Sequence, residues 1–131
     1  MIFKFKYFFI YIFFLGFFFS AQASWIKLDT AQFKALDKIT ARIKKLDINV
    51  NEEQDLGTLI IKLKSCQNRP PDYLPDSAAY IEIYDKMNLN DNDTGLIFSG
   101  WMFSSSPSIS ALDHAVYDVW VIDCMMSYIE D

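Results

Sequence analysis

The chain has 131 residues, of which 52% are hydrophobic and 17% aromatic, and its formal net charge at pH 7 is −5. This length suits one domain with a thin core. The acidic balance argues against general nucleic-acid binding, because proteins that bind nucleic acids present basic surfaces to the phosphates.

Residues 1–23 have the pattern of a signal peptide. Two lysines precede an unbroken apolar run over residues 7–19, and residues 21–23 (Ala-Gln-Ala) fit a small-x-small cleavage site. We expect cleavage after Ala23. The alternative is a retained membrane anchor, for which roughly 17–25 apolar residues are needed. Cleavage would leave residues 24–131, with ten basic and 17 acidic groups and a net charge of −7.

The first part of the mature chain carries mixed signals. Residues 24–35 favour a helix weakly, so we expect a lead-in that is a short helix or an extended arm. Residues 38–43 alternate apolar and polar side chains, which predicts a half-buried strand. The apolar positions then move from odd to even numbers over residues 46–50. A β-bulge at Lys44-Lys45, or two strands joined there, would explain the shift.

A second alternating strand is expected over residues 59–66, after a polar turn at residues 51–55, and the strands on either side of this turn should form a hairpin. On a straight strand Cys66 would share the polar face with the lysines at positions 62 and 64. Either Cys66 lies on the outer face, or a bulge near Lys64-Ser65 turns it inward.

The second half continues the β pattern. Residues 67–77 form a proline-containing loop, and residues 79–84 and 116–124 alternate as strands. Residues 96–103 are apolar on both faces, which suits a strand covered on both sides, with Gly100 as the place for a bulge. Ser106-Pro107 favours the start of a short helix that ends at Asp113 or His114.

These elements predict a mainly β fold: a small single-domain antiparallel barrel or sandwich of five to seven strands with one or two short helices. The β-domain is expected at residues 36–124, between the lead-in at residues 24–35 and a loosely held tail at residues 125–131.

Cys66 and Cys124 are the two cysteines of the chain. In an exported protein such a pair usually forms a disulfide, and we favour this over two separate buried thiols. A bridge that closes a loop of 58 residues would stabilise the domain by roughly 4 kcal/mol in the chain-entropy model.

Several segments resemble a family of exported alphaproteobacterial proteins known only as a domain of unknown function. The matching residues are Leu36–Arg42, Gly57–Leu59, Cys66 with Arg69-Pro70-Pro71, Ala78–Ile83 and nearly all of Phe98–Cys124. The most specific parts are Gly-Trp-Met-Phe at residues 100–103 and Tyr-Asp-Val-Trp-Val at residues 117–121. Ala115 departs from the family, where a proline is more usual. The resemblance implies an envelope or secreted location and brings no activity with it.

A serine hydrolase site is the sharpest catalytic hypothesis. Ser104, Ser105 or Ser106 would be the nucleophile and His114 the base, with Asp113 or Asp118 orienting the base. The chain has no Gly-x-Ser-x-Gly elbow. A serine-rich turn and helix cap explains these residues better, so we expect no enzyme.

A binding surface is the other hypothesis. Its candidate residues are Arg69, Pro70, Pro71, Trp101, Phe103 and Trp120. The proline segment could dock a partner or act as a rigid connector. The aromatic residues, together with Tyr117, could line a pocket, although we favour a place for them in the core.

Cation and polyanion sites are weaker hypotheses. Residues 90–95 hint at calcium, but their spacing does not fit the EF-hand pattern, and we expect no metal and no cofactor. Lys38, Arg42, Lys62 and Lys64 could form a basic stripe for an anionic envelope component. We favour pairing of these side chains with acidic residues such as Glu82 and Asp85.

Together these patterns lead us to expect a non-catalytic binding or interaction module that is exported to the periplasm or secreted. Its partner would be an envelope protein or an anionic envelope component, with no nucleic acid and no membrane contact except through an uncleaved leader. The alternatives are a small periplasmic hydrolase that uses Ser104–Ser106 and His114, a purely structural envelope component, and a protein anchored in the inner membrane by its N-terminal segment.

Overall fold

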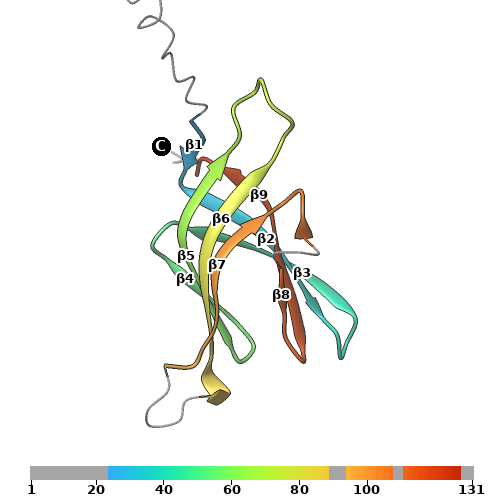
Figure 1. Ribbon diagram of the computed structural model, residues 1–131. Helices are drawn as coiled ribbons and strands as arrows, with labels where there is room; N and C mark the ends of the chain where they lie inside the picture. The colour runs from blue at the N-terminus through green and yellow to red at the C-terminus, as the bar shows by residue number, and fades with distance from the viewer. Residues whose placement is uncertain (1–23, 89–93, 108–110, 128–131) are drawn as a thin grey trace, which may run out of the picture.

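The computed structural model describes residues 24–88, 94–107 and 111–127. Within these ranges the chain forms nine strands and one short 3-10 helix (Figure 1). In chain order they are β1 (Ile26–Leu28), β2 (Thr30–Asp37), β3 (Arg42–Asn49), β4 (Glu53–Leu56), β5 (Leu59–Asn68), β6 (Ser77–Asp85), η1 (Lys86–Asn88), β7 (Leu96–Phe103), β8 (Leu112–Asp113) and β9 (Tyr117–Met125).

The strands form two antiparallel sheets that pack face to face. Sheet A has the order β1-β5-β6-β7, with β4 also paired to β5, and sheet B has the order β3-β2-β9-β8. The mainly β, antiparallel single domain is therefore confirmed, and of the two predicted architectures the sandwich is the one formed. The strands in the described ranges outnumber the predicted five to seven.

Aliphatic side chains dominate the core between the sheets. Every second residue of β2 and β6, and of β5 up to Leu63, points inward, as in a strand with one solvated face. Phe33 is the large aromatic side chain of this core. The expectation that Trp101, Phe103 and Trp120 belong to the core is wrong, because these side chains are at least partly exposed and lie outside the core cluster, whereas Tyr117 is partly buried and packs against it.

The lead-in expected at residues 24–35 is part of the domain. It contains β1, which pairs with β5, and most of β2, which lies between β3 and β9 in the middle of sheet B. Ala31, Phe33 and Ala35 are buried at alternate positions. This period of two was present in the sequence, but the weak helix propensity of the segment concealed it.

Of the strand expected over residues 38–43, residues 38–41 instead form the turn between β2 and β3, while Arg42 and Ile43 begin β3. The Asp37 carboxylate accepts hydrogen bonds from the backbone amides of Ile39 and Thr40, at 2.9 and 3.2 Å, and Ala41 has a positive φ of 56°. The side chains of Ile39 and Ile43 are 76% and 62% exposed. The β2–β3 register is continuous, so no bulge exists at Lys44-Lys45.

The hairpin in this part of the chain joins β4 to β5, with Gly57 and Thr58 as its turn. The predicted pairing of residues 46–50 with residues 59–66 is wrong, because β3 pairs with β2 in sheet B while β5 belongs to sheet A.

Strand β7 is an edge strand of sheet A and is not covered on both sides. Its bulge is at Ile97, where the β6–β7 register shifts, and not at Gly100. Most of the helix expected after Ser106 falls on residues outside the described ranges, but its predicted end at Asp113 or His114 is wrong, because β8 already begins at Leu112.

The C-terminal tail is held more firmly than expected where the structure describes it. Met125 belongs to β9. The amide and hydroxyl of Ser127 donate to the Asp29 carboxylate at 2.6 and 2.7 Å, and these bonds lower the pKa of Asp29. Asp29 lies where the chain passes from sheet A to sheet B, so the contact ties the end of β9 to this crossing point.

Candidate functional site

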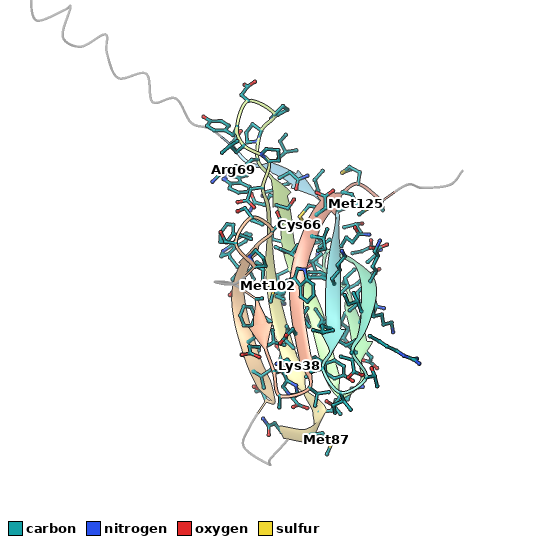
Figure 2. The ribbon with its side chains drawn as sticks, turned by 90° about the vertical axis from the view of Figure 1, so that its right-hand side faces the viewer. Lys38, Cys66, Arg69, Met87, Met102 and Met125 are labelled. Atoms are coloured by element: carbon teal, nitrogen blue, oxygen red, sulfur yellow. A yellow bond between two sulfur atoms is a disulfide. The ribbon has the colours of Figure 1, made fainter. Side chains whose placement is uncertain are left out.

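A disulfide joins Cys66 of β5 to Cys124 of β9 and so links the two sheets (Figure 2). The Cα atoms are 5.8 Å apart, and both side chains are buried. Each cysteine follows a β-bulge, at Lys64 in β5 and at Ile122 in β9, as the register shifts show. Each bulge adds one residue, so the next side chains exchange faces and both sulfur atoms point into the core.

A polar network surrounds this end of the sandwich. The Ser77 hydroxyl donates to Asn68 at 2.6 Å and lies 3.1 Å from the Asp123 carboxylate, while the Asn68 side-chain amide donates to the carbonyl of Cys124 at 2.9 Å. Ser77 is buried, and these bonds satisfy its hydroxyl. The network therefore holds the strands that carry the disulfide and offers no unpaired group to a ligand.

The candidate nucleophiles Ser104 and Ser105 belong to the same hydrogen-bond network, since Ser104 accepts from the amide of Ser77. The Ser104 hydroxyl and the Ser105 amide both donate to the Asp76 carboxylate at 3.1 Å. Burial raises the pKa of Asp76, but the hydrogen bonds from Ser105 and Ser104 outweigh it, so this pKa lies below its ordinary value. Asp76 therefore stays ionised and fixes the turn that follows β7.

The structure does not bring the serines and His114 together. Ser104 accepts a hydrogen bond from the amide of Ser77 at the start of β6, whereas His114 Nε2 lies 3.2 Å from Asp85 Oδ2 at the end of β6. A strand of this length separates its ends by about 26 Å. A nucleophile and its base must be within hydrogen-bond distance, so this pair is not an assembled site.

Asp113 and Asp118, the candidates for orienting His114, contact Lys38. Lys38 Nζ lies 2.6 Å from Asp113 and 2.8 Å from Asp118, and it also donates to the carbonyl of His114 at 2.7 Å. Lys38 holds the pKa of Asp113 below its ordinary value. This lysine ties the β2–β3 turn to β8 and β9.

The basic residues do not form one stripe. Lys38 and Arg42 belong to the β2–β3 turn and β3, whereas Lys62 and Lys64 lie on β5 in the other sheet. Lys62 pairs in register with Glu82, and Lys64 Nζ is 4.0 Å from the Glu82 carboxylate. The cross-strand pairing with Glu82 agrees with the favoured interpretation, while Asp85 contacts His114 instead.

An aromatic groove lies on the outer face of sheet A. We use this name for a hollow of about 250 Å³ that is lined by Trp25, Gln67, Ala78, Trp101 and Phe103. Register explains its position: Ala78 of β6 lies between Gln67 of β5 and Phe103 of β7. The rings of Trp25 and Phe103 meet edge to face with centroids 6.4 Å apart.

The aromatic ring of Tyr80 packs against Trp101 of this groove. Tyr80 is the cross-strand partner of Trp101, and the two rings meet edge to face at 5.3 Å. Trp101 is nevertheless 40% exposed. Aromatic pairs of this geometry are worth about 0.5–1.5 kcal/mol beyond their buried area, so Trp101 is held in place while one face stays available.

A second hollow of about 350 Å³ is also lined by Trp25, with Arg69, Pro70 and Tyr73 as its other lining residues. The Arg69 guanidinium stacks over the Trp25 ring at 5.4 Å. Pro71 is exposed in the same loop. The predicted surface residues Arg69, Pro70, Trp101 and Phe103 therefore gather around Trp25.

Trp120 is separate from this surface. It lies on β9 beside Lys34 of β2, and its neighbours Val119 and Val121 point into the core, so Trp120 faces outward from sheet B. The structure also adds Trp25 and Tyr73, which sequence reasoning missed. Trp25 was hidden in the expected lead-in, and its proximity to Arg69 follows only from the pairing of β1 with β5.

Within the described ranges, no three His, Cys, Asp or Glu side chains are grouped so that they could hold a metal ion. Most of the calcium-like segment at residues 90–95 lies outside the described residues. No helix in the part of the chain that the structure describes is long and apolar enough to cross a membrane. The signal-peptide prediction for residues 1–23 falls outside that part.

Residues 31–124 match a bacterial family described as uncharacterized protein conserved in bacteria (DUF2155). The chain belongs to this family. An uncharacterized protein of Rickettsia prowazekii (strain Madrid E) is 36% identical over 90 residues, which make up 69% of this chain and 57% of that protein. The chain thus matches little more than half the length of this relative. No solved structure matches it.

The resemblance to an alphaproteobacterial family of unknown function is therefore confirmed. The match begins at Ala31, inside β2, which agrees with the inclusion of β2 in the domain. It ends at Cys124, so the matched region contains both halves of the disulfide and both bulges that place them.

Proposed function

We propose that the protein is a non-catalytic binding module of the cell envelope, exported through its N-terminal leader, and that the aromatic groove holds its partner. The observation that carries this proposal is the groove itself: three aromatic side chains line a hollow on the solvent side of a sheet whose other face already forms the core. Partly exposed aromatic side chains at a hollow are typical of binding sites.

The position of the groove supports access by a large partner. Trp101 and Phe103 come from β7, which is the edge strand of sheet A, so no further strand of the described chain covers that side. The lining is mostly apolar, with the Gln67 amide as a polar group that could orient a ligand. Such a surface fits an apolar segment of another envelope protein.

An anionic envelope component is a weaker candidate partner. The mature chain would carry a net charge of −7, which disfavours a polyanion. The basic side chains that could have attracted one are divided between the two sheets or paired with carboxylates. We therefore favour a protein partner.

No observation favours the hydrolase alternative. Ser104 is engaged by Asp76, and His114 by Asp85 and the amide of Val116. A serine-reactive phosphonate probe should therefore leave the folded protein unlabelled.

Photocrosslinking in the cells that make the protein tests the binding proposal. A benzophenone amino acid replaces Gln67 at the rim of the groove, and adducts are identified by mass spectrometry. We expect a reproducible protein adduct, and the recovered mature chain should begin at Ser24. Trp101→Ala should lower the adduct yield roughly tenfold, as expected for an aromatic anchor.

The matched control is Trp120→Ala, which removes the same side chain from the outer face of sheet B. It should leave the yield unchanged. The absence of any reproducible adduct, or an equal loss in both variants, would contradict a binding role for the groove and favour a purely structural component.

A further inference from the structure

Large apolar side chains are exposed at the end of the sandwich where the described chain begins. Leu74 is 81% exposed, Tyr73 50% and Ile26 45%, and Tyr73 shares a hollow with Trp25. We call these four residues the N-terminal tip. Figure 1 shows the β5–β6 loop, which carries Tyr73 and Leu74, extending beyond the sandwich at the end where β1 starts.

The apolar segment that precedes Ser24 in the sequence indicates what the N-terminal tip contacts. Residues 1–23, which include the apolar run at residues 7–19, lead directly into Ser24 and Trp25. One residue spans at most about 3.6 Å, so Trp25 must stay within a few ångströms of the end of that segment. While the leader is attached and in a bilayer, the N-terminal tip therefore lies at the membrane surface.

The side chains of the N-terminal tip are of the kinds found at membrane surfaces. Trp and Tyr concentrate at membrane–water interfaces because their rings have an apolar body and a polar group. Leu74 can enter the acyl boundary, and Arg69, stacked on Trp25, can keep its charge among the headgroups.

We propose that the N-terminal tip is a contact surface for a lipid bilayer, which it touches through apolar side chains. Charge contributes little, because the cations of Lys27 and Arg69 are largely offset by Asp72 on the same loop and by the overall acidity of the chain. A few side chains bind a bilayer only weakly, so the contact orients a domain that the leader has brought there.

This orientation leaves the β7 side of the aromatic groove free, while Trp25 belongs to both the groove and the tip. Trp101 and Phe103 lie on the flank of sheet A, along β7, and not on the loop that forms the tip. The inference rests on the leader that the proposed function also uses but not on the groove, since the tip can touch lipid whether or not the groove holds a partner.

Photocrosslinking to lipid provides the test. The full chain is synthesised on vesicles of phosphatidylcholine, which contain no peptidase and leave the leader attached. A benzophenone amino acid replaces Leu74 or, as a matched control, Met87, which is 78% exposed at the opposite end of the sandwich (Figure 2). After irradiation, lipid adducts are measured by mass spectrometry, and a titration for free thiols checks that the disulfide has formed.

We expect the lipid adduct at position 74 to exceed that at position 87 about tenfold. A label at Tyr73 should behave like the label at Leu74. Replacing a third of the lipid by phosphatidylglycerol should change the yields by less than about twofold, because the contact is apolar. Equal yields at positions 74 and 87, no adduct at position 74, or a yield that requires phosphatidylglycerol would each overturn the proposal.

Discussion

Gly57 is a position at which both the backbone and a neighbouring side chain require glycine. It has a positive φ of 57°, which suits the two-residue turn between β4 and β5, and the Tyr117 ring lies directly over it. A Cβ atom built on Gly57 would come too close to the Tyr117 hydroxyl and lie 2.9 Å from Cζ of the ring. Both the backbone conformation and the contact therefore require glycine.

Gly57→Ala should lower the free energy of unfolding by roughly 1–3 kcal/mol, because it adds backbone strain and displaces the tyrosine ring. Urea unfolding measures the change. The double variant with Tyr117→Phe should recover part of the loss, since it removes the hydroxyl but keeps the strained φ. A neutral Gly57→Ala variant would show that the turn and the ring do not constrain each other.

The strands that carry the disulfide depend on their bulges. Leu59, Ile61 and Leu63 point into the core at odd positions of β5, and Cys66 joins them only because Lys64 is an extra residue in the register. The same holds in β9, where Val119 and Val121 precede Ile122. Without the bulges both cysteines would face solvent on opposite sides of the sandwich.

Insertion of one alanine between Ser65 and Cys66 should prevent the disulfide, because it moves Cys66 by one position to the outer face of sheet A. A titration for free thiols in denaturant should find two per molecule after insertion and none in the parent protein. The lost bridge is worth roughly 4 kcal/mol by the entropy of its loop.

Deletion of Lys64 is the matched control for this insertion. It removes the bulge but leaves Cys66 two positions after Leu63, on the inner face, so it should retain the disulfide even though the contact with Glu82 is lost. An intact bridge in the insertion variant would mean that side-chain direction in β5 does not decide whether Cys66 reaches Cys124.

Carboxylates with lowered pKa values tie together segments that are distant in the chain. Asp76 joins the β5–β6 loop to the end of β7, and Asp29 joins the sheet crossing to Ser127. Asp85 accepts from the amide of Met87, and this bond, together with the contact to His114, lowers the pKa of Asp85 against the opposing effect of burial. In all three cases the ionised form belongs to the folded state.

This arrangement predicts loss of stability in acid. Each of these carboxyl groups has a folded pKa below its unfolded value of 3.8. Its contribution is thus complete above about pH 5 and is lost as the pH falls through the folded pKa. The free energy of unfolding, measured with urea, should be constant from pH 7 to pH 5 and should fall between about pH 5 and pH 2.

Asp76→Asn tests the contribution of one carboxylate. The amide oxygen can still accept from Ser104 and Ser105, but the group no longer titrates, so the variant should lose less stability between these pH values than the parent does. An unchanged slope would show that the pKa of Asp76 does not differ between the folded and unfolded states.

Local pattern was enough for much of the fold. The alternation of residues 79–84 predicted β6, and the alternation near the C-terminus predicted β9 to within a residue at each end. Two cysteines in a chain with a leader pattern predict their disulfide, and parity predicts a bulge near Lys64 as one of two possibilities. Side-chain direction in a strand repeats every two residues, so a short window of sequence reveals it.

The pairing of strands could not be predicted from a short window of sequence. The partner of a strand depends on backbone hydrogen bonds to distant segments, which is why the sequence predicts a pairing of β3 with β5 and a lead-in where the central strand β2 lies. The groove depends on pairing too, because Trp25, Ala78 and Phe103 come from three strands that have to be placed side by side before their rings can meet.

Composition and spacing therefore established a small β-domain with one disulfide and an N-terminal leader pattern, because each of these is a property of one segment or of residue counts. The association of strands into two sheets established which aromatic side chains are exposed, which serine lies far from His114, and which loop extends beside the start of the chain. These features are set by contacts between segments, and burial of the apolar faces of both sheets is what selects those contacts.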